Sequence, residues 1–229
     1  VMGAASIVIK SEERTIFYTG DICTVEQELM LKFQLPTDER IDTLIIESTY
    51  GANGEADDYD YKAEIKRLGD EIGKVIARDG CVLIPSFALG RAQEILNIIA
   101  RLQNAGRFPE VPVYATGLGR AIYEIYDSFA DMLRPGANLA PMSQFKRIGD
   151  VWDPRVVPAL LREPCIVVAT SGMMIENTPS SIIAHHMVKE TKHGIFFVGY
   201  CDPDTLGHKV KHCKKDGRLV FAPALGETT

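Results

Sequence analysis

The residues with the clearest chemical potential stand in one ten-residue stretch, PSFALGRAQE at 85–94. An apolar run ends there in a small hydroxyl residue, and a glycine and a cation then open a segment with helical periodicity. Because helix N-termini attract anions, this turn can bring Ser86, the backbone N–H groups near Gly90 and the guanidinium of Arg91 to a phosphate. In the alternative interpretation, Arg91 and Glu94 form an internal ion pair that only sets the orientation of the helix.

Two further junctions repeat this pattern of small residues after an apolar run. The stretch TGLGR at 116–120 follows the run 111–115, and TSGMM at 170–174 follows the run 166–169. The carboxyl ends of neighbouring strands lie at one edge of a sheet, so the three junctions would line a groove wide enough for a single-stranded backbone.

Two carboxylates also stand where short apolar runs end. Asp21 closes YTGD at 18–21, and Glu47 opens ESTYG at 47–51. Open α/β folds present reactive side chains at such strand ends, so we expect Asp21 and Glu47 to lie in one cleft, within about 10 Å of each other. The alternative roles are purely structural: Gly-Asp would form a strand-ending turn, and the glutamate would cap a backbone end.

The elements that must position these residues alternate between strands and helices. Short β-branched or apolar runs predict strands at 6–10, 15–19, 43–47, 81–84, 111–115, 165–169 and 195–200. Apolar residues at helical spacing predict helices at 61–78, 91–104 and 121–132. We expect a linker at 51–60, and we expect the segment 133–164 to be irregular for much of its length because it carries five prolines. The alternation predicts an α/β fold with a mostly parallel sheet flanked by helices.

Composition narrows the class of protein further. The 229 residues are 46% hydrophobic and carry a net charge of −6, which excludes a uniformly basic nucleic-acid-coating protein and confines any RNA-binding surface to a patch. There is no apolar run of about 20 residues and no secretory signal, so we expect a cytoplasmic protein without membrane contact. The five cysteines form no C-x-x-C pair, which favours reduced and mostly buried thiols.

Two weaker patterns have competing explanations. The run Gly117-Leu118-Gly119 permits a nucleotide-binding α/β enzyme, but Ile122 occupies the position of the third glycine in a G-x-G-x-x-G frame. His208 and His212 are four residues apart and Cys213 follows, a spacing that permits a metal-binding site. The lysines around them favour a solvated basic face or an RNA-proximal patch.

Together, the quoted stretches resemble the RNA-processing branch of the metallo-β-lactamase superfamily that carries a β-CASP insert. The resemblance extends from VMGAAS at 1–6 to GYCDPDTLG at 199–207. It implies a partial metallo-β-lactamase lobe at 1–51, a β-CASP domain at 52–207, and a return to the first lobe at 208–229. The glycines that often follow the SGMM element are replaced here by IENTP at 175–179.

The resemblance also implies roles for the site residues. The parent enzyme would be a zinc-dependent ribonuclease in which two zinc ions activate water for attack on a phosphodiester. Asp21 would bridge the metals, and Glu47 would orient a distant histidine that protonates the leaving group. The RNA strand would be held by Ser86, Gly90, Arg91, Gly119, Arg120, Ser171 and Gly172.

Most of the metal ligands that the resemblance calls for are missing from this chain. There is no H-x-H-x-D-H cluster and no late histidine in the family's context. We therefore expect a fragment that is inactive alone. The alternatives are a non-catalytic module that binds RNA or a protein, and a nucleotide-binding enzyme. The sequence leaves open endonuclease or exonuclease action, the RNA target and the oligomeric state, with a homodimer among the options.

Overall fold

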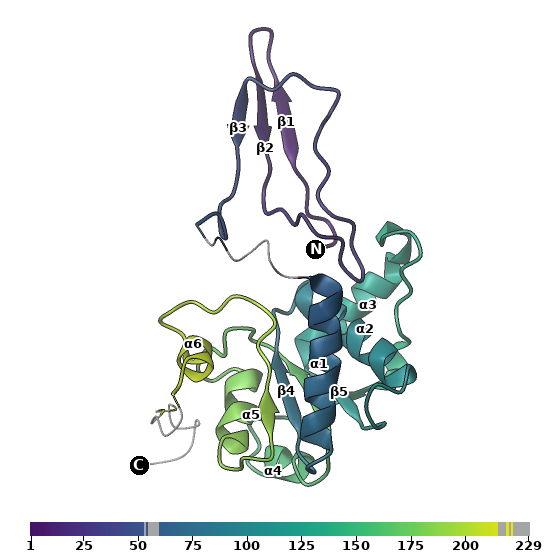
Figure 1. The fold of residues 1–229 in the computed structure, drawn as a ribbon, viewed down its shortest axis with the longest axis vertical. Coiled ribbons are helices and arrows are strands. Elements are labelled where there is room, and N and C mark those ends of the chain that lie inside the picture. The colour runs from purple at the N-terminus through teal and green to yellow at the C-terminus, as the bar shows by residue number, and fades with distance from the viewer. Residues whose placement is uncertain (53, 55–59, 215–218, 220, 222–229) are drawn as a thin grey trace.

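The chain forms two sheets of different size that lie at opposite ends of its longest axis (Figure 1). The structure, a computed structural model, describes residues 1–52, 54, 60–214, 219 and 221. The linker predicted at 51–60 and the return segment predicted at 208–229 therefore lie partly outside the described residues. Among those residues, no helix has both the length and the apolar character that crossing a bilayer requires.

The small sheet contains the first three strands in the order β1-β2-β3. These are β1 (Ile7–Lys10), β2 (Thr15–Tyr18) and β3 (Thr43–Ile45), so the three predicted strands are confirmed to within two residues. β1 is antiparallel to β2, and β3 is parallel to β2. Phe17 is buried and stacks on Phe33 at 6.2 Å, whereas apolar side chains of β1 and β3 remain exposed.

The large sheet confirms the predicted parallel α/β architecture. Its five strands run in the order β6-β5-β7-β4-β8, and every neighbouring pair is parallel. Their bounds are β4 Val82–Pro85, β5 Val113–Ala115, β6 Phe145–Arg147, β7 Ile166–Ala169 and β8 Gly194–Ile195. The central strands β4 and β7 are buried at every position, which is typical of strands covered on both faces.

Helices cover both faces of this sheet because successive strand residues point to opposite sides. Val82 and Ile84 belong to a core with α1 (Tyr61–Ile76) and α2 (Arg91–Asn104), whereas Leu83 belongs to a second core with α5 (Pro179–Met187). The remaining helices are α3 (Gly117–Ser128), α4 (Val156–Leu160) and α6 (Leu206–Lys211), with single 3₁₀ turns at 130–132 and 142–144.

Two predicted elements, α3 and the last strand, need correction. α3 begins at Gly117 and not at 121, because Thr116 adopts an extended backbone and serves as its N-cap. The segment 133–164, predicted to be irregular for much of its length, is so, although it also contains β6 and α4. The strand predicted at 195–200 is only β8, since its neighbour β4 pairs with residues 194 and 195 alone. α5, which begins with Pro179, was not predicted at all.

The cysteines agree with the expectation of reduced thiols. All five are free, and three of them are buried.

Candidate nucleic-acid interface

Asp21 and Glu47 lie beside each other at one end of the small sheet. One carboxylate oxygen of Glu47 accepts a hydrogen bond from the N–H of Ile22 at 3.4 Å, and the other accepts one from the N–H of Thr49 at 2.8 Å. Bonds from the backbone and hydroxyl of Thr49 lower the pKa of Glu47, so this carboxylate stays ionised at neutral pH. The bond to Ile22 brings the backbone after Asp21 against the Glu47 side chain, as the parallel pairing of β2 with β3 allows. That both carboxylates line one cleft stays a prediction.

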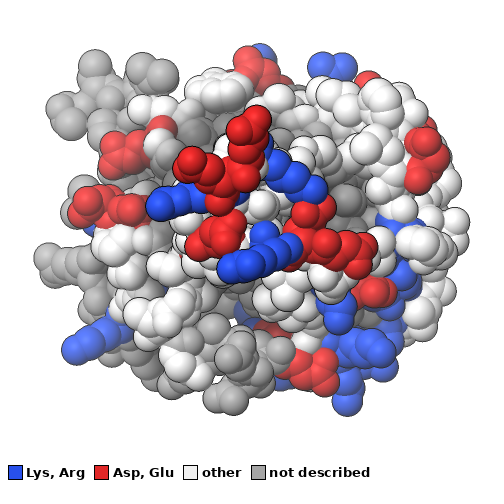
Figure 2. All heavy atoms as spheres, turned by 90° about the horizontal axis from the view of Figure 1, so that it is seen from above, with Lys and Arg blue, Asp and Glu red and all other residues white. Residues whose placement is uncertain are grey.

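Both strands run toward the large domain, so the two carboxylates lie on the side of the small sheet that faces it (Figure 1). Asp21 itself is exposed. Seen from the end that carries the small sheet, acidic and basic side chains are interspersed, with one gathering of Lys and Arg at the lower right (Figure 2). This distribution agrees with a local basic patch and not with a uniformly basic surface.

The three predicted junctions of the large sheet meet in space. The N–H of Ser86 bonds to the carbonyl of Ala169 at 2.9 Å, and the N–H of Thr170 bonds to the hydroxyl of Thr116 at 3.2 Å. A Cβ atom at Gly172 would lie only 2.8 Å from the backbone nitrogen of Phe87. The strand-end rule therefore placed these turns correctly. We call residues 86–91, 116–120 and 170–174 the strand-end surface.

Ser86 and Ser171 have local structural partners within this surface. Ser86 is 1% exposed, and its hydroxyl lies 3.4 Å from the carbonyl oxygen of Ile84. The Ser171 hydroxyl accepts from the N–H of Met173 at 3.3 Å, and its carbonyl accepts from the hydroxyl of Ser180 at 2.6 Å. Ser86 is thus buried beneath the strand-end surface, whereas Ser171 is half-buried at the edge of that surface.

Gly90 and Arg91 open α2 as the sequence predicts. Gly90 has a φ of 84°, which favours glycine, and its N–H bonds to the Gln93 side chain at 2.7 Å. The side chain of Val1 lies against it, since a Cβ at Gly90 would approach Val1 to 2.6 Å. Arg91 is half-buried, and within the described part of the chain its guanidinium has no hydrogen-bond or ion-pair partner.

The alternative interpretation of Glu94 is wrong, because its carboxylate does not bind Arg91. It accepts from the N–H groups of Glu28 at 2.7 Å and Leu29 at 3.1 Å, and from the hydroxyl of Tyr61. These bonds attach the segment after Asp21 to α1 and α2. Burial and the neighbouring Glu94 carboxylate raise the pKa of Tyr61, so its hydroxyl remains a donor.

Gly119 and Arg120 lie in the first turn of α3 and not in a free loop. The carbonyl of Gly119 accepts from the Gln93 side chain at 3.0 Å, and a Cβ there would touch Ala92 at 3.7 Å. The Arg120 guanidinium donates to the carbonyl of Phe145 at the start of β6. Gly119 therefore serves the packing of α3 against α2, whereas a Cβ at Gly117 would meet no atom within 4 Å.

Sequence reasoning missed two residues of the strand-end surface. Gln93 is fully buried, and its amide bonds to Gly90, Ala88 and Gly119, which joins the starts of α2 and α3. Phe87 is 40% exposed although it follows buried Ser86 directly. No sequence pattern indicates a buried amide between two helix starts. The aromatic residue in the turn that contains Gly90, in contrast, could have been noted as a candidate from the sequence.

No metal cluster is found within the described ranges, where three or more His, Cys, Asp or Glu side chains never come together. His208 and His212 stack with ring centroids 4.2 Å apart, but they form no such cluster with Cys213.

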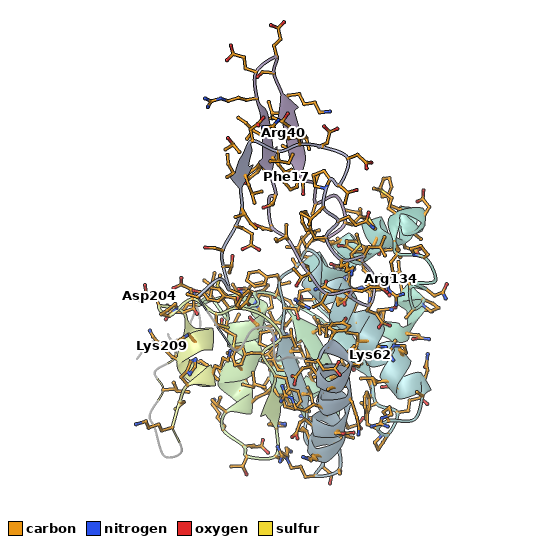
Figure 3. The ribbon with its side chains drawn as sticks, turned by 45° about the horizontal axis from the view of Figure 1, so that its top comes forward. Phe17, Arg40, Lys62, Arg134, Asp204 and Lys209 are labelled. Atoms are coloured by element: carbon orange, nitrogen blue, oxygen red, sulfur yellow. The ribbon has the colours of Figure 1, made fainter. Side chains whose placement is uncertain are left out.

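A separate hollow of about 930 Å³ lies between α1, α2 and residues 134–140. Lys62 and Arg134, labelled in Figure 3, line it together with Asn97 and Arg101. Its arginines are already engaged: Arg101 pairs with Glu28 at 2.8 Å, and Arg134 donates to two backbone carbonyls of residues 27 and 28. This hollow marks the attachment of residues 26–28 and is distinct from the strand-end surface.

The fold and the strand-end surface define an α/β domain whose parallel strands end in small-residue turns, beside an arginine that pairs with none of the described residues. Residues 92–210, just over half of the chain, match the family model described as Beta-Casp domain. The chain belongs to the β-CASP family of the metallo-β-lactamase superfamily, as the resemblance predicted.

The chain is similar to several curated proteins from archaea and eukaryotes. It is 32% identical to an RNase J-like protein of Methanocaldococcus jannaschii over 94% of this chain and 50% of that protein. It is 36% identical to transcription termination factor FttA of the same organism, over 89% of this chain and 33% of the factor. It is 30% identical to cleavage and polyadenylation specificity factor subunit 3 of Dictyostelium discoideum, over 92% and 27%. The chain thus spans half or less of the length of these relatives.

Proposed function

We propose that this chain is the RNA-holding part of a metal-dependent ribonuclease. The observation that carries the proposal is the Arg91 guanidinium at the start of α2. It has no hydrogen-bond or ion-pair partner among the described residues, and it lies beside the meeting point of three small-residue turns. A cation beside the N-terminal end of a helix suits a phosphate, although the N–H groups of Gly90, Arg91 and Ala92 already bond to Gln93, Leu89 and Phe87. Relatives named RNase J-like protein and RNase aCSPSF2 support a ribonuclease.

The proposal includes the domain division, with residues 1–51 as part of a metallo-β-lactamase lobe, 52–207 as the β-CASP domain and 208–229 as the return to the first lobe. The exposed apolar side chains of β1 and β3 support this, because such a sheet normally packs against further layers. Asp21 is the proposed metal ligand. Glu47, held by two N–H groups, is the proposed positioning carboxylate.

The described residues do not by themselves fit a zinc pair. Asp21 offers one exposed carboxylate, both Glu47 oxygens already accept hydrogen bonds, and a catalytic zinc needs about three protein ligands. The purified chain should therefore contain no stable zinc and cleave no RNA. Elemental analysis and a cleavage assay check this. About two zinc ions per chain, with cleavage lost on chelation, would show that the ligand set was misjudged.

Replacing Arg91 with alanine should weaken binding of single-stranded RNA by roughly 5- to 10-fold at low salt, since one phosphate contact is lost. The slope of log affinity against log salt should become shallower by about 1. Fluorescence anisotropy with a labelled oligonucleotide at several salt concentrations measures both quantities.

The matched control is Arg155→Ala, which removes an exposed arginine next to α4, at the end of the domain far from the small sheet (Figure 1). Replacing Arg120 as well as Arg91 should weaken binding further, with part of that loss arising through β6. Salt-insensitive binding, or unchanged binding when both arginines are replaced, would refute the proposed surface.

A further inference from the structure

Phe87 stands out on the strand-end surface because its backbone is fixed while its ring is exposed. Its carbonyl accepts from the N–H of Ala92 at 3.0 Å, and its nitrogen lies against Gly172. Phe87 is nevertheless 40% exposed. A ring exposed to this extent gains only part of the free energy of burial, so its open part is available to a ligand.

Two glycines hold one edge of this ring. A Cβ at Gly172 would lie 2.9 Å from Cδ2 of Phe87, which is too close, and a Cβ at Gly199 would lie 3.6 Å from Cε2. The ring edge therefore rests on backbone where side chains are absent, while the residue as a whole stays 40% exposed. A ring fixed in this way loses little conformational entropy when a flat ligand stacks on it.

The chemistry beside the ring indicates which flat ligand fits. Arg91, four residues along, has a guanidinium without a partner in the described ranges, and the turn between them leads into the N-terminus of α2. A nucleotide joins a flat base to a phosphate, so a strand can place a base on the ring and a phosphate near the cation. Aromatic side chains in single-strand grooves act in this way and accept every base, because each base has a π-face.

We propose that Phe87 is a stacking platform for an unpaired nucleobase of the bound RNA strand. This inference rests on the proposed function and adds a base contact to a site otherwise built for phosphate. It implies a preference for single-stranded over duplex RNA, because paired bases are already stacked on their neighbours. It does not imply a preference for one base.

The test compares two ligands that share a backbone: a single-stranded oligoadenylate, and an abasic oligonucleotide with the same number of ribose phosphates. Both are titrated at low salt into the full chain and into Phe87→Leu, which keeps apolar bulk but removes the ring. We expect Phe87→Leu to bind the oligoadenylate roughly 5- to 30-fold more weakly and the abasic strand equally well. Phe87→Tyr should bind both strands like the unmodified protein.

The matched control is Phe129→Leu. Phe129 is 51% exposed, but it follows the last residue of α3, about 14 Å along that helix from the strand-end surface. An unchanged oligoadenylate affinity in Phe87→Leu would overturn the platform while leaving the proposed function standing, because the abasic strand would still bind through Arg91. Equal losses for both strands would overturn it too, since the ring would then only support the fold. If neither strand binds the unmodified chain, the proposed function and the platform both fail.

Discussion

Replacing Glu94 with alanine is expected to lower the free energy of unfolding by about 3 kcal/mol, because two backbone N–H groups lose a charged acceptor. Glu94 is 3% exposed and holds the N–H groups of Glu28 and Leu29 as well as the Tyr61 hydroxyl. Water cannot readily replace the carboxylate at a buried site, so the lost bonds are not recovered. The segment around residue 28 should also detach from α2.

Urea unfolding followed by circular dichroism measures this loss. Glu94→Gln keeps one acceptor oxygen and should cost about half as much. The control is Glu124→Ala, which removes an exposed glutamate from α3 and should change stability by less than about 0.5 kcal/mol. A Glu94→Ala variant that unfolds like this control would show that the attachment of the segment does not depend on the carboxylate.

Replacing Gly172 with alanine is expected to lower the free energy of unfolding by about 2 to 3 kcal/mol through overpacking. The added Cβ would lie 2.8 Å from the backbone nitrogen of Phe87 and 3.1 Å from the backbone carbon of Ser86. These neighbours are main-chain atoms at the end of β4, so they cannot turn aside as a flexible side chain would. The two turns would have to separate, and the strand-end surface would open.

Gly117→Ala provides the matched control. It also adds one methyl group to a glycine of the strand-end surface, but no atom lies within 4 Å of that position. Because Gly117 opens α3, alanine should leave stability unchanged or slightly raised. Thermal unfolding of the two variants side by side separates the clash from the general effect of losing a glycine. Equal melting temperatures would contradict the close approach of the turns.

The parts of the fold that could be predicted have strong and uninterrupted patterns. α2 begins and ends at the predicted residues because its apolar spacing runs unbroken from Gly90 to residue 104. By contrast, β6 is a three-residue strand with two charged side chains, and α4 has a proline within it. Their existence depends on neighbours in the sheet, which no local pattern reports.

The same distinction separates the predicted site from the observed one. Parallel pairing brings strand ends together. The placement of Asp21 near Glu47 and of the three turns could therefore be predicted from the sequence. The partners of Glu94 were not, because they are backbone N–H groups 65 and 66 residues away along the chain. Every residue except proline has a backbone N–H group, so the residue types in the sequence could not indicate which N–H groups Glu94 binds.

The strand order of the large sheet also has a consequence for the growing chain. β4 pairs with β7 and β8, and β5 pairs with β6 and β7, so the first two strands of this sheet are never neighbours. When β4 leaves the ribosome, about 80 residues must still be synthesised before β7 can join it. Contacts of such high contact order form slowly, and the apolar β4 stays without a partner in the meantime. The nascent domain therefore depends on α1 and α2 to shield this strand until β7 arrives.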